Sequence, residues 1–227
     1  MSKVIKPLSV IILAVAVAAG AARFLSRQAD EPVETASVAD SKFTDTGGGQ
    51  FRGPLDGKSK AQITLVEFGD YQCPSCGAYF PLVNEVLARY PQQLRLEFHH
   101  YPLISIHPNA MAAHKAVEAA GEQGKYWEMH DLVFEYQPVW SQRPNPEPDF
   151  LALAGRIGLN QNAFMQAMRS PAVEERILKD VVRAREANVE AVPTFFINGE
   201  QVFPRPSVED FSRIIDEHLK TSQPVTN

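Results

Sequence analysis

Two short runs of apolar residues, 63–68 and 94–100, have the length and alternation of β-strands. In 63–68 apolar side chains fall on both faces, so this strand is expected to be central and buried on both sides, whereas 94–100 alternate as a second strand. Between them, apolar residues recur at helical spacing over 79–90, and Pro91 ends the pattern. A strand, a helix and a strand joined by such short links predict a right-handed parallel βαβ unit.

The chain then changes to helical periodicity and returns to β character near its end. Residues 194–197 predict a strand, Asn198-Gly199 a hairpin turn and 201–203 a second strand, and Ser207 caps a final amphipathic helix that runs to about 219. A helical block at about 107–188 therefore interrupts one sheet, which predicts an α/β fold: a central mixed β-sheet flanked by helices, with an inserted all-helical subdomain. The helices expected in the block are 108–121, 125–136, 148–157, 161–168 and 171–187.

The N-terminus is the most strongly biased segment. Two lysines precede an uncharged apolar run at 7–22, which is typical of a signal peptide or a signal anchor. Small residues at 19–21 suit cleavage, whereas Arg23 and Arg27 suit an uncleaved anchor, and we favour the anchor. Residues 1–27 are thus expected to place the protein in the cell envelope or periplasm, tethered to the inner membrane by the apolar run.

The rest of the chain divides into a linker and one domain. Residues 28–60 are polar and include three consecutive glycines, so we interpret them as a flexible linker. Residues 61–220 form the predicted domain, and 221–227 a disordered tail. The formal net charge of -5 comes from interspersed acids and bases without a basic stripe, so we expect no nucleic-acid partner.

The chain contains two cysteines, Cys73 and Cys76, separated by Pro74 and Ser75. A disulfide that closes so short a loop removes little entropy from the unfolded chain, so a purely structural role is a poor explanation. A structural zinc site needs four ligands, and the six histidines are not spaced to complete one. Redox chemistry is the interpretation that remains strongest, with a copper or zinc carrier that uses the cysteines and distant histidines as the alternative.

The position of each cysteine predicts its role. Cys73 is expected at the N-terminus of the helix, where the helix dipole and free amide groups stabilise a thiolate nucleophile. Cys76, one turn inside, is better placed to resolve a mixed disulfide. Pro74 and Ser75 tune the thiols and lie where a substrate would make contact.

An acid precedes the cysteines on the same strand. Glu67 shares its strand face with Ile63 and Leu65, so the alternation buries a carboxylate that could exchange a proton with Cys76. The alternative is a structural acid that accepts backbone hydrogen bonds. Asp70 is expected to cap the helix or to face solvent.

These motifs resemble the DsbA-like branch of the thioredoxin-fold thiol-disulfide oxidoreductases, whose members are exported and often membrane-anchored. The resemblance covers most of residues 53–219. It is carried by Gly53-Pro54-Leu55-Asp56-Gly57, Val66-Glu67-Phe68-Gly69-Asp70-Tyr71-Gln72-Cys73-Pro74-Ser75-Cys76, Tyr101-Pro102-Leu103, Tyr126-Trp127-Glu128-Met129-His130 and Pro193-Thr194-Phe195-Phe196-Ile197-Asn198-Gly199.

The resemblance implies roles that local sequence does not. Pro193 would be a cis-proline beside Cys73, Glu67 the buried acid, and Val192 the residue whose backbone pairs with a substrate peptide. The helical block would cover the active face and form an apolar groove, although its aromatic residues, Trp127, Phe134, Tyr136 and Trp140, are more often core residues.

The implied function is a monomeric enzyme that donates the Cys73–Cys76 disulfide to reduced exported proteins, with no cofactor beyond that disulfide. A quinone-linked membrane protein would reoxidise it. Ser75 stands where the best-known member has histidine, so an envelope reductase or isomerase remains the alternative.

Overall fold

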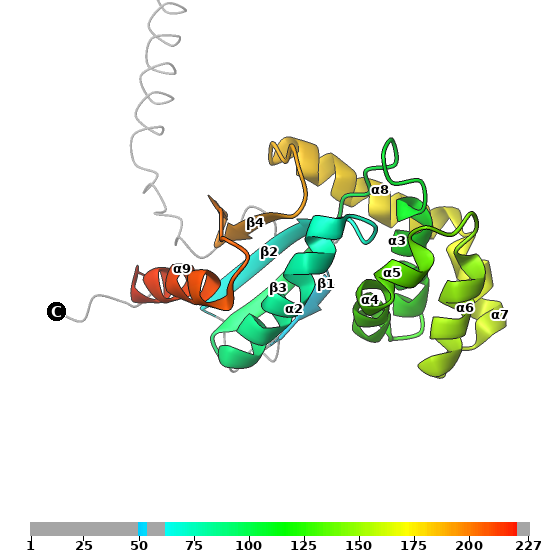
Figure 1. Ribbon diagram of the computed structural model, residues 1–227, viewed down its shortest axis with the longest axis horizontal. Coiled ribbons are helices and arrows are strands. Elements are labelled where there is room, and N and C mark those ends of the chain that lie inside the picture. The colour runs from blue at the N-terminus through cyan, green and yellow to red at the C-terminus, as the bar shows by residue number, and fades with distance from the viewer. Residues whose placement is uncertain (1–49, 54–61, 222–227) are drawn as a thin grey trace, which may run out of the picture. The chain divides into compact units, whose positions relative to one another are not determined.

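The computed structural model describes residues 50–53 and 62–221 (Figure 1). The predicted signal or anchor at 1–27 and most of the predicted linker lie outside these residues. Among the described helices, none combines the length and the apolar character needed to cross a membrane.

The sheet has five strands in the order β1-β3-β2-β4-β5. The two strands predicted around the first helix, β2 and β3, pair in parallel, and the other three pairings are antiparallel, so the sheet is mixed as expected. The predicted hairpin joins β4 to β5. The strands are β1 (Gln50–Arg52), β2 (Ile63–Gly69), β3 (Leu94–His100), β4 (Thr194–Ile197) and β5 (Glu200–Val202).

Strand β1 corrects the predicted linker, which extended to residue 60. Gln50–Arg52 pairs antiparallel with β3 at the edge of the sheet. The carbonyl of Phe51 accepts a hydrogen bond of 2.6 Å from the Trp127 indole, and the Arg52 guanidinium lies 4.7 Å from the centre of the Trp127 ring. Trp127 lies about 75 residues further along the chain than β1, so the local composition around β1 gave no sign of this strand.

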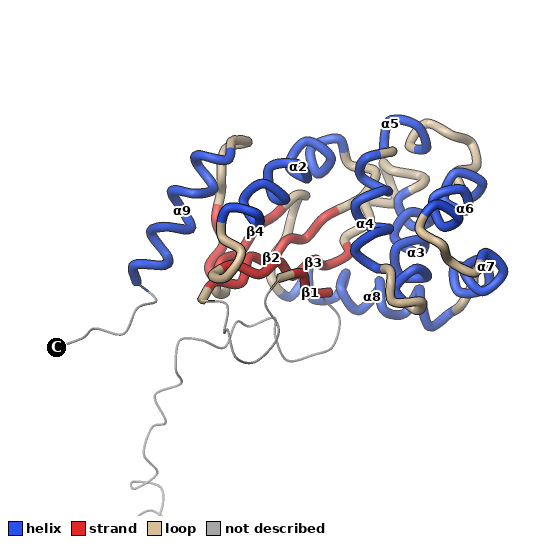
Figure 2. The backbone as a smooth tube through the Cα atoms, turned by 90° about the horizontal axis from the view of Figure 1, so that it is seen from below, coloured by secondary structure: helices blue, strands red, loops and turns tan. Residues whose placement is uncertain are grey.

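Helices cover both faces of the sheet, as the two-sided burial predicted for β2 requires. Ile63 and Leu65 pack with α2 (Pro74–Arg89) and α9 (Val208–Thr221), whereas Val66 and Phe68 pack against α8 (Pro171–Glu186). Figure 2 shows α2 and α9 on one side of the strands and α8 on the other. Helix α9 extends one residue into the predicted tail, whose other residues lie outside the described part.

The helical insertion has its own core, in which Trp140, Phe150 and Phe164 are fully buried. The five predicted helices of this block are confirmed to within two residues at each end. The short helix α5 was not predicted, because four residues are too few to show a helical period. The helices of the insertion before α8 are α3 (Ala110–Gly121), α4 (Tyr126–Glu135), α5 (Gln137–Trp140), α6 (Glu147–Arg156) and α7 (Gln161–Met168).

Candidate active site

The cysteine pair lies where β2 leads into α2. Cys73 is the N-cap residue of the helix in an extended backbone conformation, and Pro74 occupies the first helical turn, where its missing amide hydrogen costs nothing. Cys73 is 7% exposed and Cys76 is fully buried. The predicted arrangement of an outer and an inner thiol is confirmed.

The surroundings of the two sulfurs drive their pKa values apart. A hydrogen bond from the Cys76 thiol, assisted by the amides of Cys76 and Ser75, lowers the pKa of Cys73 to about 6 against the opposing effect of burial. Burial, together with the hydrogen bond and charge of Cys73, raises the pKa of Cys76 well above 9.0. At neutral pH the outer sulfur is therefore a thiolate and the inner sulfur a thiol.

Glu67 is the acidic residue whose burial was predicted from the alternation of residues along its strand. Its side chain is 3% exposed, and its Oε1 has no hydrogen-bond partner within the described part of the chain. Burial raises the pKa of this carboxyl to about 8. Since its charge also contributes to the raised pKa of Cys76, the two groups interact.

The loop before β4 lies against the outer thiol. The Val192–Pro193 peptide bond is cis, as the resemblance implied. The Cys73 thiol, when protonated, donates to the Val192 carbonyl over 3.8 Å. Residues separated by 119 positions in the sequence are thus neighbours in the site.

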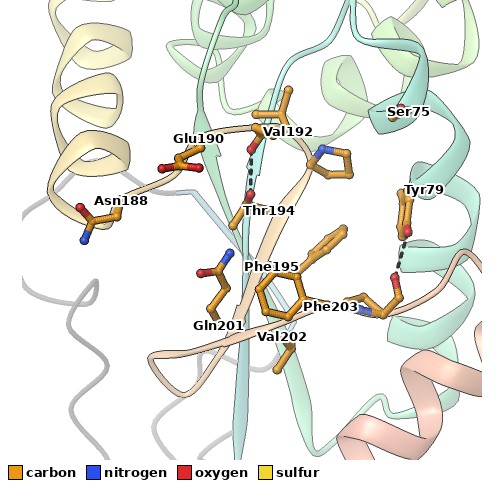
Figure 3. A pocket seen from close by; sticks show the side chains of 13 residues that line it. Ser75, Tyr79, Asn188, Glu190, Val192, Thr194, Phe195, Gln201, Val202 and Phe203 are labelled. Atoms are coloured by element: carbon orange, nitrogen blue, oxygen red, sulfur yellow. Dashed lines mark hydrogen bonds between the residues drawn. The ribbon is translucent and has the colours of Figure 1, made fainter.

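A cavity of about 700 Å³ opens beside this loop (Figure 3). Ser75 and Tyr79 of α2 form one wall, residues 188–195 the second, and residues 201–204 the third. Tyr79 donates 2.9 Å to the Pro204 carbonyl across the lower end, and the ring of Phe203 is 78% exposed. The cavity therefore offers backbone groups and aromatic surface next to the nucleophile.

The apolar groove expected over the active face stays a prediction. The cavity of about 700 Å³ is lined by α2, the loop before β4, and β5 with the residues that follow it. A smaller cavity of about 260 Å³ adjoins Pro74, and residues that flank helices of the insertion, Asn109 and Ser141 among them, line it. Phe134 packs against Phe80 of α2 and Trp140 against Phe150, so both are core residues, as expected for aromatic residues of the insertion.

Asp70 is the residue that sequence analysis misplaced most clearly. It is fully buried beneath the cysteines and neither caps α2 nor faces solvent. Its carboxylate accepts hydrogen bonds from the Gln72 amide at 2.8 Å, the Leu103 amide at 2.8 Å and His107 Nδ1 at 2.7 Å. Two of these donors lie more than thirty positions away, so no local signal could have found them.

The histidines lie in separate hydrogen-bonded settings. His100 contacts His114 at 2.6 Å and the Glu118 carboxylate at 3.0 Å, whereas His99 lies between Glu97 and Asp180. In the residues that the structure describes, no three or more histidine, cysteine, aspartate or glutamate side chains are grouped so that they could hold a metal ion.

Comparison with known proteins gives a family and a fold. The family model described as Thioredoxin matches residues 52–217. The Na(+)/H(+) antiporter NhaA 1 of Salinispora arenicola is 37% identical over 164 residues, which are 72% of this chain and 24% of that protein. The chain thus spans about a quarter of the length of the curated relatives it matches.

Two solved structures are similar over most of the chain. BdbD of Bacillus subtilis has a TM-score of 0.67 at 21% identity and covers 76% of this chain and 94% of its own. Alpha-DsbA1 of Wolbachia pipientis also has a TM-score of 0.67, at 19% identity, covering 78% and 94%. These likenesses confirm the predicted fold with its helical insertion.

Proposed function

Because the chain belongs to the thioredoxin family, we propose that it is a thiol-disulfide oxidoreductase that donates the Cys73–Cys76 disulfide to reduced exported proteins. One observation carries the proposal: the Cys73 sulfur at the start of α2, whose pKa is lowered to about 6, receives a hydrogen bond from the fully buried Cys76 thiol, whose pKa is raised well above 9.0. Such a pair makes Cys73 the sulfur that forms and leaves mixed disulfides, since a stabilised thiolate is a good leaving group.

The reaction begins with the pair oxidised. A substrate thiolate attacks the Cys73 sulfur, the bond between the two cysteines breaks, and Cys76 takes the electron pair and a proton. A second substrate thiolate then attacks the substrate sulfur of the mixed disulfide and expels the Cys73 thiolate. The substrate gains a disulfide and loses two electrons, and the enzyme dithiol gains them.

Glu67 supplies the proton that Cys76 needs. Its pKa of about 8 keeps the carboxyl protonated near neutral pH, and no described group ties up its Oε1. Proton transfer to the inner sulfur, directly or through a water, avoids a buried thiolate. Glu67→Gln is expected to slow exchange and alter its pH dependence without disturbing the fold, and unchanged kinetics across pH would return Glu67 to a structural role.

The substrate would bind as an extended peptide beside the Val192–Pro193 loop. The large cavity has Ser75 on one side and this loop on the other, and the neighbouring Pro74 is exposed. Backbone hydrogen bonds to the Val192 residue would hold peptides of many sequences, which suits an enzyme with varied substrates.

The direction of electron flow follows from the Cys73 thiolate. Its low pKa stabilises the reduced enzyme and so favours donation of the disulfide. The proposed setting is the cell envelope, with a monomeric enzyme and a quinone-linked membrane protein as the reoxidising partner. The antiporter activity of the longer relatives is not carried over, since the matched part is a quarter of each.

Two experiments test the proposal. In Cys76→Ala, substrates should remain trapped on Cys73 as mixed disulfides that a reducing agent releases, and Cys73→Ala serves as the matched control that traps none. Redox titration against glutathione should give a reduction potential well above that of thioredoxin, whose own potential is about -270 mV. A potential near that of thioredoxin would favour the reductase alternative. Absence of both trapping and exchange would refute the proposal that the protein is a thiol-disulfide oxidoreductase.

A further inference from the structure

Gln137 connects the helical insertion to the backbone of the nucleophile. It is the first residue of the short helix α5. Its side-chain Nε2 donates to the Tyr71 carbonyl at 2.6 Å and to the Cys73 carbonyl at 2.9 Å. One amide group therefore holds two carbonyls on either side of the turn that leads into α2.

Gly77 provides the room that this contact requires. A Cβ atom at position 77 would lie 2.5 Å from Gln137 Oε1, closer than real contacts allow. Gly77 also donates its own amide to the Cys73 carbonyl at 3.1 Å, so this carbonyl uses both of its acceptor sites. The glycine after Cys76 and the glutamine of α5 thus form one arrangement around the Cys73 backbone.

A second glutamine holds the same turn from the other side. Gln72 donates to the Ser141 carbonyl at 2.8 Å and accepts from the Asn109 amide at 2.7 Å. Both partners belong to the helical insertion or its connecting loops. The turn before Cys73 is therefore fixed by the insertion rather than by the sheet alone.

We propose that Gln137 is a positioning residue for Cys73, an inference that rests on the proposed disulfide exchange. The low pKa of Cys73 depends first on the hydrogen bond from the Cys76 thiol and then on the amides of Cys76 and Ser75 that reach its sulfur. Their direction is set by the first turn of α2, and that turn is held at its start by the two hydrogen bonds from Gln137. The residue acts through the backbone and does not touch the reacting sulfur.

The main test replaces Gln137 with leucine, which has a similar size and no donor. The pKa of Cys73, read from thiolate absorbance near 240 nm, is expected to rise by about one unit, and exchange with glutathione in which Cys73 is the leaving sulfur to slow by about threefold, because a less acidic thiol leaves more slowly. Gln166→Leu is the matched control, because Gln166 is an exposed glutamine on α7 far along the chain from the site. It should change neither quantity.

Gly77→Ala gives an independent test of the same arrangement. The added methyl group must displace the Gln137 amide, so this variant should raise the Cys73 pKa to a similar extent. In Gln137→Ala the space is free, and adding Gly77→Ala should then cause little further change. Such non-additivity is the signature of two residues that act as one unit.

The outcomes are distinct. If Gln137→Leu lowers stability but leaves the Cys73 pKa and the exchange rate unchanged, Gln137 is merely structural and the inference is wrong. Should that variant fail to fold, Gln137→Met, which keeps the length of the side chain without its donor and adds no charge, must raise the Cys73 pKa, or the inference is refuted. Failure of the wild type itself to exchange with glutathione would count against the proposed function and not against this positioning.

Discussion

Replacing Glu67 with glutamine should remove the part that this carboxyl contributes to the loss of stability of the wild type as pH rises from about 4.5 to about 8. Burial raises the pKa of Glu67 from 4.5 to about 8. In the unfolded chain the carboxyl ionises near its usual value, whereas in the folded protein it stays neutral until pH 8. Between these values the folded state holds one more proton than the unfolded state, so stability falls as pH rises.

The size of the effect follows from the two pKa values. A difference of about 3.5 units corresponds to roughly 5 kcal/mol in the free energy of unfolding, lost at about 1.4 kcal/mol per pH unit and complete above pH 8. Glutamine has the shape of the neutral acid and does not ionise. Relative to the wild type, Glu67→Gln should be close to equal near pH 4 and more stable by several kcal/mol above pH 8.

Urea unfolding of the reduced proteins, followed across this pH range, measures the difference. Glu128→Gln is the matched control, because Glu128 is exposed, pairs with Lys125, and has a lowered pKa. Removing the charge of Glu128 should lower the free energy of unfolding only slightly at any pH where this carboxyl is ionised, and the variant should not become more stable than the wild type at high pH. A stability difference between wild type and Glu67→Gln that does not grow with pH would show that the Glu67 carboxyl is already ionised in the fold.

Three further results are expected. The thiolate absorbance of Cys73 should titrate with a midpoint near pH 6. Since the Cys76 thiol is the main hydrogen-bond donor to Cys73, Cys76→Ala should raise this midpoint more than Cys76→Ser, which keeps a donor. Equal midpoints in the two variants would contradict that cause. Burial alone would lower the pKa of His99, but hydrogen bonds to Asp180 and Glu97 raise it from 6.5 to about 8. Protonated His99 should therefore contribute about 2 kcal/mol to the free energy of unfolding below pH 6.5, and this contribution is lost as pH rises through 8. Unfolding of His99→Gln measured across this range should lack this contribution. Arg52→Ala removes the cation–π contact with Trp127 and leaves the partly buried Asp131 without its cation, so it should lower the free energy of unfolding in urea by about 1–3 kcal/mol. A change near zero would mean that these contacts of β1 contribute nothing to stability.

Periodicity in the sequence was enough to predict the central sheet and the helical insertion. Strands β2 and β3 and the long helices have several turns or alternations each, and burial of their apolar faces decides their structure. The positions of Cys73 and Glu67 also followed from the local pattern, one at a helix start and one on a buried strand face. In these cases the physical cause lies within a few residues.

Features whose partners lie far along the chain could not be predicted in this way. Asp70 has the local composition of a cap, yet it is buried because donors from Leu103 and His107 reach it. Arg52 lies in a stretch rich in glycine and is ordered by Trp127. Gln137 follows an aromatic helix with no motif of its own, and its role depends on two carbonyls more than sixty residues earlier.

The pairing of β2 with β4 also sets the order in which the molecule can be completed. Strand β4 begins at Thr194 and pairs with β2, which ends at Gly69, so the whole helical insertion must be made before the sheet can close. Contacts across so long a stretch form late, because the chain between them must first be ordered. During synthesis both cysteines therefore leave the ribosome well before Val192 can cover Cys73. The newly made chain passes through a stage with an open, reactive thiol pair, and folding of the insertion is what ends its exposure.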